Sequence, residues 1–328
     1  MAPCNPDFRP TANWANLRLR AELLRKTREF FHDRGFLEVE TPLLSADVVV
    51  DRHLDPIPVT LADDPCRPNI GRRMWLQTSP EFGMKRLLAA GAPAIYQITR
   101  AFRNAEIGPL HNPEFTMLEW YRAGDGMHEG MALLGELCEC LLARGSVERM
   151  SYGDAFARHV GVDPHCASIA DLRAAADRYG GVAPAGLGDD RDGWLDLLLV
   201  ERVQPHLGRP RPTILFDYPA SQAALARIRE QPRPVAERFE LYVDGVELAN
   251  GYHELLDAAV LRQRIAAANV RRAADGKPQL PSESRLLDAM EAGLPPCSGV
   301  ALGFDRLVMV AAGARTLAEV MPFPIDRA

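Results

Sequence analysis

One short stretch of the chain, YQITRAFRNAEIGPLHNPEFTMLEWY at residues 96–121, concentrates an arginine, an aromatic side chain and several carboxylates. Arg103 follows a segment of alternating residues and Glu114 opens a second one, so we predict two strands joined by a loop, with the arginine at a strand end. A planar guanidinium can donate two parallel hydrogen bonds to a phosphate and stabilise the charge that develops in AMP transfer, and Phe115 can stack on adenine. The stretch therefore predicts activation of a carboxylate by ATP.

The order of these residues is more informative than any one of them, because lone arginines and phenylalanines in strands are mostly structural. An ordinary hairpin with surface charges would account for each residue singly. FRN followed by HNPEFTMLEWY, however, resembles the second motif of class II lysyl-tRNA synthetases. The resemblance implies that Arg103 is catalytic and that the stretch contacts ATP through Arg103, Asn104, Ala105, His111, Asn112 and Phe115.

Two distant segments resemble the other motifs of this family. FFHDRGFLEVETPLL at residues 30–44 is similar to the first motif, a helix followed by a strand that closes on Pro42. SGVALGFDRLVMV at residues 298–310 is similar to the third, in which Arg306 would be the second catalytic residue, on the γ-phosphate, and Gly303 would let the backbone approach the adenosine. A glycine-containing strand before a helix is a weak signal alone, but three motifs in order are a strong one.

Length and composition favour one ordinary folded domain. The 328 residues are 47% apolar and 25% charged, enough to bury a sizeable core. Because residues 30–44 and 298–310 must meet at one site, we expect a single catalytic domain over 1–328. The resemblance implies an α+β fold, an antiparallel sheet flanked by helices. No membrane segment or secretory signal is evident, so we expect a cytoplasmic protein.

Cysteines, histidines and charge suggest no competing function. The six cysteines lack the paired spacing of a zinc site or a disulfide framework, and the eight histidines form no ligand pairs. The net charge of −6 gives no basic footprint for nucleic acid. The helix of the first motif begins near Leu17, which leaves no room for the anticodon-binding domain of lysyl-tRNA synthetases, so we expect tRNA not to be a substrate.

Periodicity and turn residues predict the elements that position these groups. Apolar residues over 17–34 fall on one helical face. Ser79 is expected to cap a helix that begins at Pro80 and ends at Gly91. Residues 51–71 are typical of loop and short strands. A helical insertion is expected at about 126–207, with helices over 126–144, 151–160, 169–179 and 192–207 and a flexible joint at 180–188.

After this insertion, TILFDYP is predicted to be a buried strand, and RFELYVDGVELANGYHEL a hairpin that turns at Asp244 and Gly245. Glu247 and Glu254 on its second strand differ by an odd number of residues, so a regular strand would place them on opposite faces. We expect a bulge at Gly251 to correct this. The spacing alone suits a solvated hairpin equally well.

ELANGYHEL resembles the segment with which class II lysine enzymes hold Mg²⁺ and the substrate amine. The resemblance implies that Glu247 and Leu248 contact ATP. Carboxylate oxygens and ATP phosphates are suitable Mg²⁺ ligands, with Glu247 the first candidate and Glu254 the second.

TSPEFGMKRLL also matches the lysine-enzyme pattern, although Glu81 alone would be an ordinary helix-start carboxylate. A substrate with two ammonium groups needs anionic partners, since breaking a buried charge pair costs roughly 3–5 kcal/mol. The resemblance implies that the substrate is contacted by Ser79, Pro80, Glu81, Glu119, Tyr121, Asn250, Glu254 and Ala301.

Over nearly its whole length the chain resembles the elongation factor P-lysine ligases, lysyl-tRNA synthetase paralogues reduced to a catalytic core. The resemblance implies a homodimer, with its interface around Pro42, that uses ATP to activate (R)-β-lysine and transfers it to a lysine side chain of elongation factor P. Ala301 stands where the tRNA-charging relatives carry glycine. An added methyl in a tight pocket costs typically 1–3 kcal/mol, so it can reject one lysine isomer and admit another.

Two positions depart from the family's pattern. Ala105 replaces a glutamate that lies near the adenine amino group in the lysine synthetases, and the next residue, Glu106, would point the other way on a strand. Either the loop bends or the contact is missing. Pro109 and Leu110 replace a basic residue before the histidine, which fits loss of tRNA.

Other functions remain open. A stand-alone lysine-activating enzyme that acts on tRNA or a small molecule would share all the ATP residues. An asparagine synthetase-like ligase would need a pocket for an acidic side chain, whereas Glu81, Glu119 and Glu254 predict a cationic substrate. A missing contact at Ala105 would suit a non-catalytic ATP-binding regulatory protein. No general base is evident, because His111 is better suited to bonding backbone or phosphate.

Overall fold

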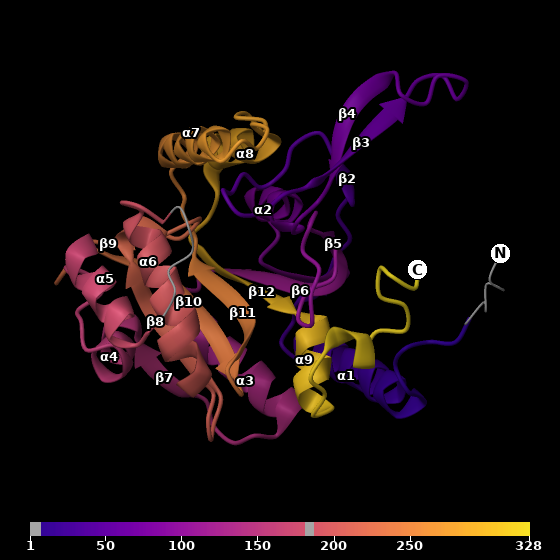
Figure 1. Cartoon of the computed structure of the whole chain (residues 1–328). Helices are drawn as coiled ribbons and strands as arrows, with labels where there is room; N and C mark the ends of the chain where they lie inside the picture. Colours follow the sequence, from indigo (N-terminus) through magenta and orange to yellow (C-terminus); the bar gives the residue numbers. More distant parts are fainter. Residues whose placement is uncertain (1–7, 181–186) are drawn as a thin grey trace, which may run out of the picture.

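The computed structural model describes residues 8–180 and 187–328. Its centre is a nine-stranded sheet with the order β1-β5-β6-β12-β11-β10-β8-β7, and β9 pairs with β10 (Figure 1). The pairs are antiparallel except β1 with β5 and β7 with β8. The strands are β1 (Leu37–Glu38), β5 (Ala94–Phe102), β6 (Glu114–Ala123), β7 (Glu148–Ser151), β8 (Thr213–Pro219), β9 (Ile228–Arg229), β10 (Val235–Val243), β11 (Val246–His253) and β12 (Cys297–Gly303).

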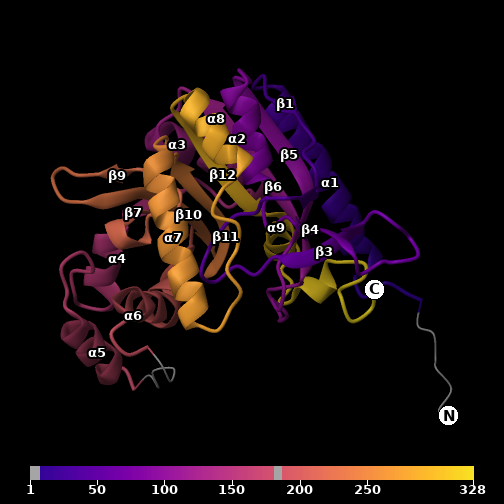
Figure 2. The same ribbon diagram turned by 90° about the horizontal axis from the view of Figure 1, so that it is seen from above.

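The two faces of the sheet are covered by different helices. Figure 2 shows three of them lying across one face: α2 (Glu81–Ala89), α7 (Ala258–Ala274) and α8 (Arg285–Gly293). The other face packs against α1 (Trp14–His32), α3 (Met127–Leu142) and α9 (Phe304–Ala311). Helices flanking a mostly antiparallel sheet make an α+β fold, which confirms the expected fold class.

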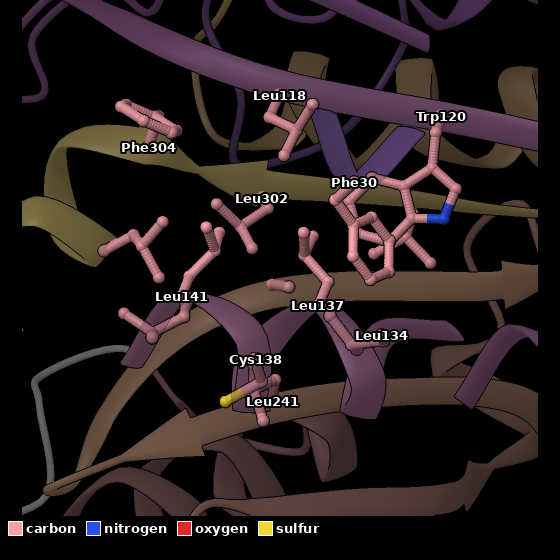
Figure 3. Close-up of a cluster of buried hydrophobic side chains, with 14 of the residues drawn as sticks. Phe30, Leu118, Trp120, Leu134, Leu137, Cys138, Leu141, Leu241, Leu302 and Phe304 are labelled. Atoms are coloured by element: carbon pink, nitrogen blue, oxygen red, sulfur yellow. The ribbon is translucent and has the colours of Figure 1, made fainter. Parts of the chain in front are cut away.

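The face beneath α1 and α3 forms the largest apolar core (Figure 3). Phe31 of α1 is fully buried, and its ring stacks on Tyr96 and lies 5.3 Å from the Trp120 ring. The predicted helical face of 17–34 is therefore confirmed, although α1 begins earlier, where the Asn13 side chain accepts a hydrogen bond from the Asn16 N–H. Burial of this stripe holds α1 against strands β5 and β6.

The predicted helical region contains α3, α4 (Tyr152–His159), α5 (Ile169–Arg178) and α6 (Arg191–Leu198). The helix expected at 192–207 is broken, because α6 continues as a π-helical turn at Leu199–Val203 and a 3₁₀ turn at Gln204–His206. Strand β7 was not predicted. The expected flexible joint falls mainly on residues 181–186, which lie outside the described residues.

A small second sheet accounts for the expected loop and short strands. It consists of β2 (Leu44–Ser45), β4 (Gly71–Leu76) and β3 (Ile57–Ala62), and the β3–β4 hairpin projects from the body of the molecule in Figure 1. Within the described ranges, no helix is both long and apolar enough to cross a membrane.

The predicted hairpin turns where expected, because Asp244 and Gly245 both have positive φ. The bulge, however, lies at Leu248 and not at Gly251: Tyr242 pairs with Glu247, and Leu241 pairs with Ala249. Gly251 serves another purpose, since a Cβ there would lie 2.4 Å from the Phe239 ring. The extra residue at Leu248 places Glu247 on the same face as the side chains at 250, 252 and 254.

Candidate active site

A cavity of about 680 Å³ lies over the face of the sheet that carries α2 and α7. Strand register brings Glu119, Ala301 and Asn250 into one cross-strand row on this face, because Ala301 pairs with both of the others. Segments nearly 200 residues apart in sequence therefore share one wall. Of the predicted site residues, the cavity is lined by Ser79, Glu81, Arg103, His111, Asn112, Phe115, Glu247, Leu248, Asn250, Ala301, Gly303 and Arg306.

The remaining predicted residues lie behind or beside this lining: Pro80, Asn104, Ala105, Glu119, Tyr121 and Glu254. Glu119, Tyr121 and Glu254 are buried and bond to groups next to the cavity wall. Asn104 and Ala105 are exposed on the loop after β5. Asn112 lines the cavity, but its amide nitrogen donates to the Glu114 carbonyl and its oxygen accepts from the Ile325 N–H.

Arg103 lies just beyond the end of β5, as the sequence predicts. Its guanidinium carbon is 5.0 Å from the centre of the Phe115 ring, and one nitrogen is 3.9 Å from the Glu106 carboxylate. Its Nε is buried and has no hydrogen-bond partner. The Arg103 guanidinium is thus only weakly engaged within the protein and retains donors for an anionic ligand.

Arg306 is held more firmly, at the start of α9. Its Nε donates to the Leu110 carbonyl, Nη1 donates to the Glu247 carbonyl, and Nη2 lies 2.7 Å from Nε2 of His111. Burial, with Arg306 beside it, lowers the pKa of His111. A neutral imidazole that accepts from an arginine orients that arginine and is not free to act as a base, so no general base emerges at His111.

Arg20, which the sequence did not single out, joins the segments that carry the two catalytic candidates. Its guanidinium contacts Asp305 at 2.5 Å and donates to the Thr116 hydroxyl at 2.7 Å. The other Asp305 oxygen accepts from the Thr116 N–H at 2.6 Å. Asp305 is fully buried, so this network fixes the start of α9, which carries Arg306, against β6. The only signal in the sequence was an acidic residue beside Arg306.

The loop after β5 bends, which answers the question raised by Ala105. Strand β5 ends at Phe102, and Ala105 has a φ of 63°, a left-handed conformation. The turn directs the chain so that Glu106 lines the cavity. The strand argument that would have pointed Glu106 away does not apply here, and its carboxylate lies in the cavity beside Arg103.

The start of α2 brings Ser79 and Glu81 to the cavity. The helix begins at Glu81 with Pro80 as its N-cap residue, one position later than predicted, and it ends at Ala89, before Gly91. Ser79 is therefore not the cap residue, but its hydroxyl still accepts from the Glu81 N–H at 3.1 Å. The same hydroxyl donates to Glu119 at 2.7 Å.

Three buried carboxylates, Glu81, Glu119 and Glu254, form with Lys85 what we call the acidic cup. Lys85 was missed by the sequence reasoning. Its Nζ is 2.5 Å from Glu81 and 2.6 Å from Glu254, and its side chain is 2% exposed. Glu119 accepts hydrogen bonds instead, from the Ser79 hydroxyl at 2.7 Å and from the Tyr121 hydroxyl at 2.6 Å. The i, i+4 spacing of Glu81 and Lys85 was the one available signal.

Burial and mutual repulsion govern ionisation in the acidic cup. Burial, reinforced by the Glu81 charge, raises the pKa of Glu119 to about 7. Burial also raises the pKa of Glu254, to about 8, against the opposing effect of Lys85. Although burial opposes it, the pair of carboxylates raises the pKa of the Lys85 ammonium. Lys85 therefore stays protonated. A positively charged ligand that entered the acidic cup would lower the pKa values of Glu119 and Glu254 and favour their ionisation.

Two features shape the wall between the acidic cup and the rest of the cavity. Asn250 donates to the Tyr252 hydroxyl at 3.1 Å, but its Oδ1 is buried without a partner and can accept from a ligand. Gly299, which the sequence did not single out, must lack a side chain, because a Cβ there would lie 2.1 Å from the Tyr121 ring and 2.5 Å from Glu254. Ala301 lines the cavity between Glu119 and Asn250.

Glu247 is the carboxylate best placed for a metal beside phosphates. Its side chain is 39% exposed and lies 4.0 Å from Arg306. Desolvation in the cavity and the neighbouring buried Glu240 raise the pKa of Glu247 to about 7. Across residues 8–180 and 187–328, no group of three or more His, Cys, Asp or Glu side chains is arranged to hold a metal, so phosphate oxygens would have to complete any such site.

Comparison with known proteins agrees with this geometry. The profile of the class II tRNA synthetases (D, K and N) matches residues 6–327. The chain belongs to this family. It is also 48% identical over 321 residues to proteins named elongation factor P--(R)-beta-lysine ligase from Salmonella arizonae, Salmonella paratyphi B and Salmonella schwarzengrund. Each match covers 98% of this chain and 98% of the relative.

Proposed function

We propose that this protein is an ATP-dependent ligase that activates (R)-β-lysine as an adenylate and transfers it to a lysine side chain of elongation factor P. The observation that carries the proposal is a single cavity with Arg103 and Arg306 in one part and the acidic cup against another. The extent of similarity to the named ligases, 98% of both chains, supports the same substrates.

The arginine part of the cavity suits a bent triphosphate. Phe115 offers a ring face to adenine, Arg103 donates to the α-phosphate, and Arg306 donates to the γ-phosphate. A carboxylate oxygen of the amino acid forms the bond to the α-phosphorus while the bond to pyrophosphate breaks. Because that carboxylate is already a nucleophile, the residues act by positioning and by stabilising charge on the phosphate.

Magnesium fits the donor set on the arginine side. Glu247 would hold the ion, with ATP phosphates and water supplying the other oxygens, and the bound ion would neutralise phosphate charge. Glu254, the second candidate, is engaged with Lys85, so we assign it to the acidic cup and not to the metal. A cation beside Glu247 would also keep that carboxylate ionised despite its raised pKa.

The acidic cup suits a diamine. Glu119 presents a carboxylate that bonds only to hydroxyl groups among the described residues, and the free Oδ1 of Asn250 adds an uncharged acceptor nearby. The Ala301 methyl narrows the wall between them, which would help to distinguish β-lysine from α-lysine by fit. These contacts would orient the substrate carboxylate toward Arg103.

In the second step the amine of the protein lysine bonds to the carbonyl carbon of the adenylate. The bond from that carbon to the AMP oxygen breaks, AMP leaves, and the amine loses a proton to solvent. Arg103 stabilises the phosphate charge on the leaving AMP. We further propose that the enzyme works as a homodimer through the segment around Pro42.

Pyrophosphate exchange with (R)-β-lysine, (S)-β-lysine and L-lysine tests the first step. We expect exchange to be fastest with the (R)-β isomer. Transfer of labelled product to elongation factor P, but not to tRNA, tests the second step. Preferred charging of tRNA would instead favour a stand-alone lysine-activating enzyme, and no exchange with any isomer under saturating ATP would contradict the proposal.

A further inference from the structure

Lys85 occupies a position that the reaction itself does not explain. It extends from α2 into the acidic cup, and its ammonium contacts Glu81 on one side and Glu254 on the other. The nitrogen also lies 5.9 Å from the centre of the Tyr121 ring. The lysine joins α2 to the residue that follows β11. It also adds positive charge to a pocket whose carboxylates suit a cationic ligand.

We propose that Lys85 is a resident counter-ion that sets the charge of the acidic cup to match a substrate with two ammonium groups. It is a positioning residue, because it acts through Glu81 and Glu254. The diamine character of the ligand rests on the proposed function, but the charge of the acidic cup does not.

The charge count carries the proposal. Three carboxylates against one ammonium leave a net charge of −2 when all are ionised. Without Lys85 the same volume would hold three adjacent carboxylates, which cannot all ionise when buried. Without one carboxylate the acidic cup would hold −1, too little for two ammonium groups. Lys85 therefore makes the number of negative charges equal to the number of positive charges that the ligand brings.

Geometry supports a fixed arrangement of these charges. Glu254 lies against Gly299, where even a Cβ would come within 2.5 Å of its oxygen, so the carboxylate has little room to move. Glu119 is fixed by two hydroxyl donors. The charged and titratable groups that act on Glu119 and Glu254 are Glu81, Lys85 and Tyr121. Behind them lie Tyr252 and Cys297, which in turn are influenced by Arg238, Glu240 and Asp125. The Arg238 guanidinium is already paired with Glu240 at 2.5 Å, so these two charges offset each other and leave the count in the acidic cup unchanged.

The test compares the wild type with Lys85→Met, Glu254→Gln and the double variant. The KM values for β-lysine and for ATP are measured by pyrophosphate exchange at pH 7. Each single variant should raise the KM for β-lysine at least about tenfold, because a shift of one pKa unit in a cup carboxylate corresponds to a tenfold change in an equilibrium constant. The KM for ATP should stay within about threefold. The double variant restores the net charge of −2, so it should bind β-lysine more tightly than either single variant.

A purely structural role for Lys85 predicts the opposite, since two losses in one packed cluster would leave the double variant no better than the worse single variant. That result would overturn the proposal. Lys26→Met, at a half-exposed position of α1 away from the cavity lining, is the matched control and should change neither KM.

Thermal unfolding of the ligand-free proteins gives a second measurement that needs no substrate. Buried carboxyl groups with raised pKa values stabilise the fold while protonated and destabilise it as pH rises through those values. Lys85→Met should therefore lose more stability relative to wild type at pH 8.5 than at pH 5.5. The double variant also lacks Glu254, whose raised pKa destabilises the wild type as pH rises, so it should not lose more stability relative to wild type at pH 8.5 than at pH 5.5.

If Lys85→Met differs from the wild type in stability by the same amount at pH 5.5 and pH 8.5, the proposal is overturned. A double variant that fails to fold would also overturn the proposal, because the net charge of its acidic cup equals that of the wild type. If only Lys85→Met fails to fold, the double variant must still bind β-lysine more tightly than Glu254→Gln. Absence of lysine-dependent exchange in the wild type would contradict the proposed function, and the unfolding measurement would still decide the role of Lys85.

Discussion

The two parts of the cavity hold their charged groups in different ways. In the arginine part, Arg306 is positioned by backbone carbonyls and His111, and Arg103 lies over an aromatic ring, so both guanidiniums keep contact with the open cavity. In the acidic cup, Lys85 and three carboxylates bond to one another and to hydroxyl groups, almost without exposure. The first arrangement favours binding of a large anion, because donors of both guanidinium groups remain available to it. The second fixes a charge pattern before the ligand arrives.

This difference predicts where pH and mutation act. A group held by backbone keeps its charge and position when a neighbour changes, whereas groups that pair with one another respond together. Changes among the arginines should therefore alter the rate of adenylate formation. Changes in the acidic cup should alter the binding of the amino acid.

The largest expected effect is that of Arg103→Ala. Loss of a donor that stabilises charge on the α-phosphate should lower kcat for pyrophosphate exchange by about 10²–10³-fold, with a smaller change in the KM for β-lysine. Steady-state exchange measures both constants. Arg72→Ala, on the exposed β4, is the control and should change neither. A large rise in the amino acid KM with normal kcat would show that Arg103 belongs functionally with the acidic cup.

Glu119→Gln should act on binding. It removes the charge of the carboxylate that bonds to the Ser79 and Tyr121 hydroxyl groups, so we expect the KM for β-lysine to rise about 100-fold, as charge-assisted hydrogen bonds contribute roughly 1.5–3 kcal/mol. The KM for ATP should stay within about twofold. Glu136→Gln, exposed on α3, is the matched control. Equal effects on both substrates would erase the distinction between the two parts of the cavity.

The pH dependence of binding should differ between the two substrates. Burial raises the pKa of Glu119 to about 7, and its proton must leave before an ammonium group can bind, so the KM for β-lysine should fall up to about tenfold per pH unit as pH rises from 6 to 7. Ionisation of Glu254, with a pKa of about 8, should extend the fall to pH 8.5. The KM for ATP should vary less. Exchange kinetics between pH 6 and 8.5 measure both. A KM for β-lysine that rises over this range would contradict the assignment of Glu119.

The smallest effect is expected from Ala301→Gly. Removing one methyl between Glu119 and Asn250 widens the cavity wall without changing charge, so the preference for (R)-β-lysine over L-lysine should fall by about tenfold, roughly 1.4 kcal/mol. The ratio of kcat/KM values for the two isomers measures it. An unchanged ratio would mean that the isomers are distinguished elsewhere.

Much of the architecture could be predicted because it depends on local pattern. Alternation gave β5 and β6, and the Asp244–Gly245 pair gave the hairpin turn, since both follow from the conformations that a few neighbouring residues allow. The boundary errors are small for the same reason: α2 starts one residue later than predicted because Pro80 takes the N-cap position. The unpredicted β7 has no such local signal and exists through its pairing with β8.

The site was partly predictable because its residues lie in motifs that resemble those of a known family. Motif resemblance named Arg103, Arg306, Glu81 and Glu119, but it could not show which groups bond to which. The bulge at Leu248 and the left-handed turn at Ala105 depend on packing and pairing across the sheet, so the predicted bulge at Gly251 was wrong and the direction of Glu106 was left open. Arg20, Lys85 and Gly299 were missed because each acts through contacts with residues distant in sequence.

The sequence by itself determined which residue types are available and the spacing that sets helix, strand and turn, because these depend on short-range sterics and hydrogen bonding. Only the tertiary structure decided that Lys85 lies between Glu81 and Glu254 and that Glu119 bonds to the hydroxyl groups of Ser79 and Tyr121. The pKa values of the carboxylates in the acidic cup depend on this spatial arrangement. Desolvation and charge interactions act through space, between side chains that strand register and helix packing bring together.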